Sequence, residues 1–116
     1  MSHPDPETFL PLTAPEFYVL LALGEQALHG YGMMRSLEEK TGGKDELLPG
    51  TLYATLARMV GRGLLEELPE PPDPGADSRR RYYRATALGL SVARAESARY
   101  TRLLQIAAAA RLIPAR

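Results

Sequence analysis

The chain has 116 residues, enough for one domain with a modest core and too few for two. Apolar residues make up 45% of it and charged residues 24%, as in an ordinary globular protein. It contains no cysteine, which excludes disulfides, thiolate metal sites and cysteine nucleophiles. The longest dense apolar run, Phe17 to Leu23, is too short to cross a bilayer, and the acidic, proline-broken start of the chain is unlike a signal peptide. We therefore expect a cytoplasmic protein with no membrane partner.

The charges cancel in number but not in position. Fourteen basic and fourteen acidic residues give a formal net charge of zero. Acidic residues gather between Glu66 and Asp77, whereas basic residues gather between Arg79 and Arg84 and along the last part of the chain. One face of a neutral protein can therefore still bind DNA, although the neutral total predicts weaker non-specific binding than a basic domain would show.

The chain begins with a predicted arm and a first helix. Residues 1–12 are rich in proline and show no periodicity, so we expect a flexible arm. Thr13 and Glu16 form the pattern of a capping box, which predicts a helix that starts there and ends near Gly24-Glu25.

Two more helices follow. After a tight connection, a second helix is predicted from about Tyr31 to Thr41. Gly42-Gly43 should end it, because glycine readily adopts the left-handed backbone conformation. Pro49 is suited to the first turn of a third helix, which Gly61 and Gly63 end. The expected apolar stripe of the second helix consists of Tyr31, Met34 and Leu37.

A hairpin and a long helix complete the chain. Leu64–Leu68 and Arg80–Ala85 have the length of short strands, and the loop between them, Pro69–Ser78, holds four prolines. The arginine cluster is therefore expected at the tip of the hairpin. Thr86 is a plausible cap for a last helix that runs to about Arg111, roughly 26 residues or about 39 Å.

This order of elements predicts a mainly α fold with a small β-hairpin: a winged helix-turn-helix with a C-terminal dimerisation helix. The expected divisions are the arm at 1–12, the winged helix at 13–86 and the C-terminal helix at 87–116. So long a helix cannot bury itself against so small a domain, and its alanine-rich stripe lets another helix approach closely. We expect a second copy of the chain to cover it, through Val92, Ala95, Leu103, Ile106, Ala107 and Ala110.

The third helix and the arginine cluster are the expected DNA contacts. A winged helix places such a helix in the major groove and its hairpin on the backbone. Threonine and alanine can contact a thymine methyl, hydroxyl groups donate to phosphate, and arginine binds guanine or phosphate. The expected contacts are Gly50, Thr51, Tyr53, Ala54, Thr55, Arg58, Arg79, Arg80 and Arg81.

Each of these residues also has a purely structural interpretation. The helix face can be merely solvated, with Tyr53 partly in the core, and the arginines can merely keep a hairpin soluble. Arg84 is expected to pair with Glu66 or Glu67 across the strands.

We expect neither catalysis nor a bound metal or cofactor. The chain has no nucleophile, base and orienting group in a recognisable set, and no glycine-rich phosphate loop. His29 has only His3 as a fellow histidine, so no metal-ligand set is credible, and we expect it to pack or to cap a turn.

Five short segments together resemble the PadR-like transcriptional regulators. They are residues 28–32 (Leu-His-Gly-Tyr-Gly), 49–53 (Pro-Gly-Thr-Leu-Tyr) with Leu56, 63–64 (Gly-Leu), 80–86 (Arg-Arg-Tyr-Tyr-Arg-Ala-Thr) and Gly89, and the resemblance spans about Thr13 to Arg102. It implies a homodimer that binds a palindromic operator in double-stranded DNA, usually as a repressor and sometimes released by a small molecule. The short chain resembles the subfamily with one C-terminal helix. Many members carry an acidic residue where this chain has Ala87.

The resemblance also implies two further contacts. Tyr31 matches a position that touches phosphate at a helix N-terminus, and Tyr100 matches an aromatic position that stacks flat ligands at the dimer centre. Glu96 lies one helical turn before Tyr100, so we expect it at the rim of that site. The alternative for Tyr100 is ordinary dimer packing. Two rival functions stay open: a winged helix that binds an acidic protein partner, and a small-molecule carrier or sensor.

Overall fold

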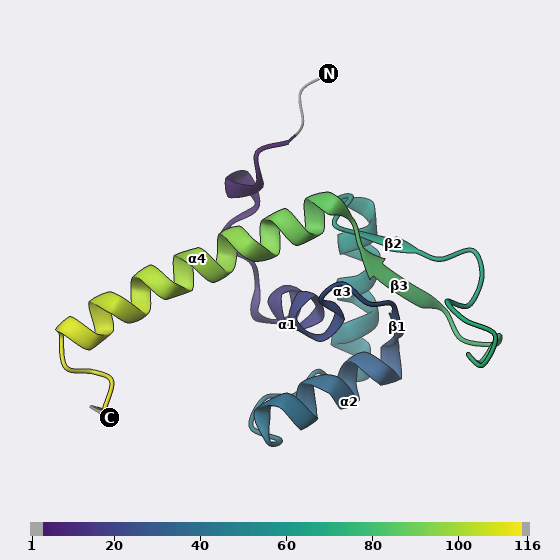
Figure 1. Ribbon diagram of the computed structural model, residues 1–116, viewed down its shortest axis with the longest axis horizontal. Coiled ribbons are helices and arrows are strands. Elements are labelled where there is room, and N and C mark those ends of the chain that lie inside the picture. The colour runs from purple at the N-terminus through teal and green to yellow at the C-terminus, as the bar shows by residue number, and fades with distance from the viewer. Residues whose placement is uncertain (1–3, 115–116) are drawn as a thin grey trace.

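The computed structural model describes residues 4–114. These form a mainly α fold with one small antiparallel sheet, which confirms the expected fold class. In Figure 1 the short helices and the sheet form one body, and the second half of the last helix extends away from it. In chain order the elements are η1 (Pro6–Phe9), α1 (Ala14–Leu23), β1 (Leu28–His29), α2 (Gly30–Thr41), α3 (Pro49–Gly61), β2 (Leu65–Glu67), β3 (Tyr82–Ala85) and α4 (Ala87–Ala109).

The helix starts follow the local sequence signals. The Thr13 hydroxyl accepts from the Glu16 backbone N–H at 3.3 Å, and the Glu16 carboxylate accepts from the Thr13 N–H at 2.8 Å, which confirms the capping box. His29 caps α2 through Nδ1, as expected, and Thr86 caps α4 through its hydroxyl. Side-chain acceptors of this kind satisfy the unpaired N–H groups of a first turn.

The sheet contains one strand that the sequence did not reveal. β3 lies in the centre and pairs with β2 and with β1, the segment expected to be only a tight connection. β1 has two residues, too few for a recognisable pattern, and only its pairing with a strand far along the chain makes it one. The two predicted strands are present but shorter than expected.

α4 begins in close contact with the start of the wing, the hairpin formed by β2 and β3. The Thr86 N–H donates to the Leu64 carbonyl at 3.1 Å, and its hydroxyl donates to the Gly63 carbonyl at 2.6 Å. A Cβ at Gly89 would lie 2.0 Å from the Leu64 carbonyl oxygen. Only glycine lets the first turn of α4 approach this strand so closely.

The core joins residues from all four α-helices and the wing. Its largest fully buried apolar side chains are Val19, Leu23, Met33, Leu52, Leu56, Met59, Leu64 and Val92. The apolar stripe predicted for α2 is partly wrong, because Met33 and Leu37, one turn apart, face the core while Tyr31 is half exposed. Val92 is fully buried inside its own protomer, so its assignment to a dimer interface is also wrong.

The expected flexible arm is wrong for residues 4–12. Asp5 caps η1, Phe9 and Leu10 pack against the core, and Leu12 is buried within it. Residues 1–3 of that arm, and 115–116 of the expected C-terminal helix, lie outside the described residues. α4 ends at Ala109, and Arg111 just beyond it has a positive φ of 61°.

Candidate nucleic-acid interface

One side of α3 is buried and the other faces solvent. Gly50, Thr51, Tyr53, Ala54 and Arg58 are exposed, in agreement with their predicted role at a surface. Thr55 is only 1% exposed, so the prediction that it contacts a base is wrong. It lies three residues after Leu52 and four before Met59, in the same row of the helix, and that row faces the core.

The wing arginines lie beside the start of α2 rather than at the hairpin tip. The backbone N–H of Leu68 donates to the carbonyl of Tyr82 at 2.8 Å, so pairing of the strands continues up to the residue that follows the arginines. The cluster is therefore next to the sheet, and the proline-rich acidic residues 69–77 form the outer loop. The predicted tip position of the arginines is wrong for this reason.

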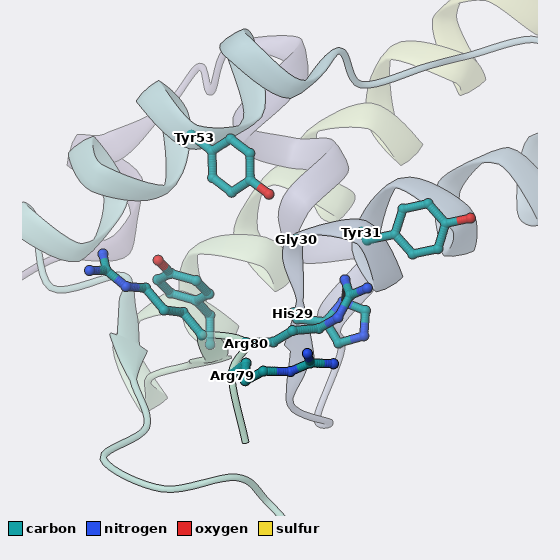
Figure 2. A pocket seen from close by; sticks show the side chains of 8 residues that line it. His29, Gly30, Tyr31, Tyr53, Arg79 and Arg80 are labelled. Carbon is teal, nitrogen blue, oxygen red and sulfur yellow. Dashed lines mark hydrogen bonds between the residues drawn. The ribbon is translucent and has the colours of Figure 1, made fainter. Parts of the chain in front are cut away.

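A hollow of about 320 Å³ is lined by the arginines, by the start of α2 and by Tyr53 of α3. Figure 2 shows the side chains of Arg79 and Arg80 beside His29. The guanidinium of Arg80 lies 5.5 Å from the ring centre of Tyr31, and that of Arg35 lies 5.9 Å from the same ring. The residues that line the hollow are His29, Gly30, Tyr31, Tyr53, Arg79, Arg80, Arg81 and Tyr83.

Acidic side chains of the wing already accompany the three arginines. Asp77 lies 3.2 Å from Arg79 and 3.6 Å from Arg80, and Glu67 lies 3.6 Å from Arg81. The hydrogen bond from Arg79 lowers the pKa of the Asp77 carboxyl. Because all these pairs are exposed to solvent, each contributes little, and a phosphate can replace the carboxylate.

His29 joins the α2 cap to the arginine cluster. Its Nδ1 accepts from the Gly32 N–H at 2.9 Å and lies 3.4 Å from an Arg80 nitrogen. Burial and the neighbouring Arg80 charge lower the pKa of His29, which favours the neutral ring that capping requires. The hydrogen bond assigns the ring proton to Nε2.

Arg58 has a partner that the sequence analysis missed. The carboxylate of Glu16, only 3% exposed, lies 3.5 Å from Arg58 and 3.3 Å from Arg62. Burial raises the pKa of Glu16, but hydrogen bonds from Thr13 and the Arg58 charge outweigh it, so this pKa is lowered. Arg58 was predicted to contact DNA, and in the structure the buried charge of Glu16 holds it against α1.

Arg84 pairs with Glu66 across the strands at 2.9 Å, as expected. This pair lies on the hairpin but, unlike Arg79, Arg80 and Arg81, Arg84 does not line the hollow.

Glu96 and Tyr100 serve contacts within the protomer. Glu96 is fully buried and accepts from the Leu12 N–H at 2.8 Å and from Arg99 at 3.1 Å, so its assignment to a ligand rim is wrong. The Tyr100 ring packs edge-on against Phe17 at 5.0 Å, with the Arg99 guanidinium 4.9 Å from its centre.

The second half of α4 carries an exposed apolar surface. Leu103 and Ile106, predicted for the dimer interface, are exposed in the protomer, and so is Leu104, which was not predicted. Of the alanines predicted for this interface, Ala95 and Ala107 are half-buried and Ala110 is exposed.

Two general findings concern the described part of the chain. None of its helices combines the length and the apolar character needed to cross a membrane. Residues 4–114 hold no group of three or more acidic or histidine side chains able to bind a metal ion.

The chain is similar to known transcriptional regulators. The family model described as "Transcriptional regulator PadR-like family" matches residues 19–95. A search of curated proteins gave no significant match. A PadR family regulator from Clostridium difficile R20291 is 20% identical, with 82% of this chain and 95% of the other aligned at a TM-score of 0.68. RosR from H. salinarum is 28% identical, with 88% of this chain and 98% of the other aligned at a TM-score of 0.57.

A third structure was solved with a ligand. PcaV from Streptomyces coelicolor, in complex with its natural ligand, is 32% identical, with 84% of this chain and 61% of the other aligned at a TM-score of 0.61. Because the family model covers well over half of the chain, this protein belongs to the PadR-like family of transcriptional regulators, which is not a family of enzymes.

Proposed function

We propose that this regulator binds a palindromic DNA operator as a homodimer and represses the genes beside it. The observation that carries the proposal is that α3 exposes Thr51, Tyr53 and Ala54 beside the hollow lined by Tyr31 and Arg80. The major groove admits a helix of this size, and arginines and a tyrosine hydroxyl at its edge suit the flanking phosphates.

The exposed half of α4 supports a homodimer. Leu103, Leu104 and Ile106 are 45%, 58% and 64% exposed on a helix that extends from the body. Clustered exposure of large apolar side chains marks an interaction surface, and a two-fold pair of helices would bury the same patch on each copy. Sedimentation should give a dimer for the parent and a monomer for Leu104→Glu; a dimer in both would place the interface elsewhere.

Salt dependence tests the DNA contacts. We expect the affinity for the chain's own upstream DNA, followed by fluorescence anisotropy, to fall steeply with salt. Arg80→Ala with Arg81→Ala should weaken all sequences about equally and reduce the log–log slope by about 0.9 for each lost phosphate contact. Arg84→Ala is the matched control, since Arg84 pairs with Glu66 outside the hollow, and it should leave the slope unchanged.

A second measurement separates DNA from a protein partner. Thr51→Val should change the preference at one base pair by about 1–3 kcal/mol, because only a base contact responds to sequence. An unchanged slope in the double arginine variant, together with no base preference, would favour an acidic protein as the partner instead.

A small aromatic effector is the last part of the proposal. PcaV, a similar regulator, was solved with its natural ligand. In this chain we assign the contact to Tyr100 without Glu96, since the carboxylate is buried by its own protomer. Titration with flat phenolic compounds should show binding that Tyr100→Ala removes, and equal binding by both proteins would exclude this site.

A further inference from the structure

Residues 9–13, from the last residue of η1 to the N-cap of α1, are here called the N-terminal strap. In Figure 1 the chain passes α4 along this segment on its way from η1 to α1. Leu12 is only 6% exposed, and Phe9 and Leu10 pack against the core. The strap is therefore a packed part of the domain.

Two buried carboxylates hold consecutive backbone amides of the strap. The Leu12 N–H donates to Glu96 on α4, and the Thr13 N–H donates to Glu16 on α1, each at 2.8 Å. Glu96 is fully buried and Glu16 is 3% exposed. A buried carboxylate is costly unless it is both hydrogen-bonded and paired, so these contacts resist rearrangement. The pairing cations are Arg99 for Glu96, and Arg58 and Arg62 for Glu16.

The strap also contacts the end of α3 directly. The guanidinium of Arg62, the C-cap residue of α3, lies 4.8 Å from the ring centre of Phe9. The same guanidinium lies 3.3 Å from Glu16. Arg62 therefore joins the end of α3 both to the strap and to the carboxylate that holds it.

α3 and α4 have little direct contact, whereas each packs against α1 and α4 packs extensively against η1. Their relative orientation can therefore be set by α1, by the strap or by the β2–β3 hairpin, since β2 packs against α3 and the Leu64 carbonyl accepts from the Thr86 N–H at the start of α4. The polar contacts run without a break from Arg58 and Arg62 through Glu16, the strap amides and Glu96 to Arg99.

We propose that the N-terminal strap is a positioning element that fixes the angle between α3 and α4, and thereby sets the half-site spacing that the dimer accepts. The inference rests on the proposed function, because it takes α3 to enter DNA and α4 to form the dimer. Two helices that insert into successive major grooves must match both the distance and the rotation between half-sites. A small change in the α3–α4 angle is therefore amplified at the DNA.

Glu96→Leu tests the proposal, with Arg94→Gln as its control. The first variant removes the acceptor of the Leu12 N–H, whereas the second removes a charge of α4 that pairs with the exposed Glu25 and leaves that acceptor in place. In the free protein, Glu96→Leu should speed amide hydrogen exchange about tenfold or more at residues 12–13 and in the last turn of α3, residues 58–62. Arg94→Gln should leave both regions close to the parent, because its ion pair is exposed.

DNA binding gives the second measurement. Palindromes with half-site spacing varied in single base pairs should differ in affinity for the parent by about tenfold or more. Glu96→Leu should reduce that range to about threefold or less, whereas a variant that is merely less stable loses affinity for every spacing alike. If Glu96→Leu opens residues 12–13 but changes neither α3 exchange nor the spacing profile, α1 or the β2–β3 hairpin sets the angle and the proposal is wrong.

A substitute variant and a DNA-free measurement keep failure of the strap proposal distinct from failure of folding or of DNA binding. If Glu96→Leu does not fold, Glu16→Gln is used instead, because glutamine keeps the capping hydrogen bonds and loses the charge that holds Arg58 and Arg62. It should loosen the end of α3 and flatten the spacing profile, and an unchanged profile would reject the strap. If the parent binds no DNA, the proposed function fails, while hydrogen exchange still decides whether the strap holds α3.

Discussion

Gly50 occupies a position where the fold has no need of glycine. It is the second residue of α3, it is not among the residues with positive φ, and a Cβ there would meet no atom of the described chain within 4 Å. Alanine is a better helix former than glycine by up to about 1 kcal/mol and restricts the unfolded chain. Gly50→Ala should therefore stabilise the fold by about 0.5–1 kcal/mol in urea unfolding.

DNA binding should respond in the opposite direction. If the first turn of α3 enters the major groove, the added methyl lies where the helix backbone approaches DNA most closely, and we expect a loss of about tenfold, or about 1.4 kcal/mol. Gly61→Ala is the matched control at the far end of α3, where a Cβ also meets open space. It should give a similar gain in stability and unchanged affinity in fluorescence anisotropy.

Two results would refute this reasoning. If Gly50→Ala binds DNA as tightly as the parent, the first turn of α3 is not at the interface. If Gly61→Ala loses as much affinity as Gly50→Ala, the effect belongs to the stiffness of the whole helix rather than to a contact.

Further predictions concern packing and pH. Gly89→Ala should lower the free energy of urea unfolding by at least about 1–3 kcal/mol, because its Cβ would lie 2.0 Å from the Leu64 carbonyl oxygen; parent-like stability would mean that α4 does not dock there. The pKa of Glu96 is lowered from 4.5 in the folded chain, so its contribution is full above pH 4.5 and is lost as the pH falls through the lowered value. Glu96→Gln should weaken this loss of folding free energy at acid pH, and an unchanged loss would contradict the assignment to Glu96. The pKa of His29 is lowered from 6.5, so the stability of the fold should decrease as the pH drops below about 6.5. His29→Asn, which keeps a helix cap, should remove this pH dependence in thermal unfolding. A pH dependence that persists in the variant would assign it to another group.

Features set by neighbouring residues could be predicted from the sequence. The capping box of Thr13 and Glu16, the caps at His29 and Thr86, and the left-handed Gly42 all depend on contacts within one helical turn. The order of the helices and the family match follow from the same kind of short-range signal. The exposed face of α3 was found in the same way.

Features set by distant residues could not be predicted. The arm over residues 4–12 is packed because Glu96, far along the chain, accepts from Leu12, and β1 exists only because β3 pairs with it. Glu96 is a charged residue that the sequence analysis placed at a surface, and only the packing of the strap shows it buried. Thr55 is a different case, since its helical spacing from Leu52 and Met59 already predicts burial and its polar side chain was given too much weight.

The arginines near the candidate interface fall into two electrostatic classes, and this difference bears on discrimination between DNA sequences. Arg79, Arg80 and Arg81 have exposed acidic partners, which a phosphate can replace at little cost. Arg58 shares the buried Glu16 with Arg62, and part of the compensation of that carboxylate would be lost if Arg58 moved away. DNA of any sequence can therefore take these three arginines from the wing's own carboxylates, and their contacts add affinity without discriminating between sequences. Discrimination then has to come from the exposed side chains of α3, whose contacts depend on base sequence.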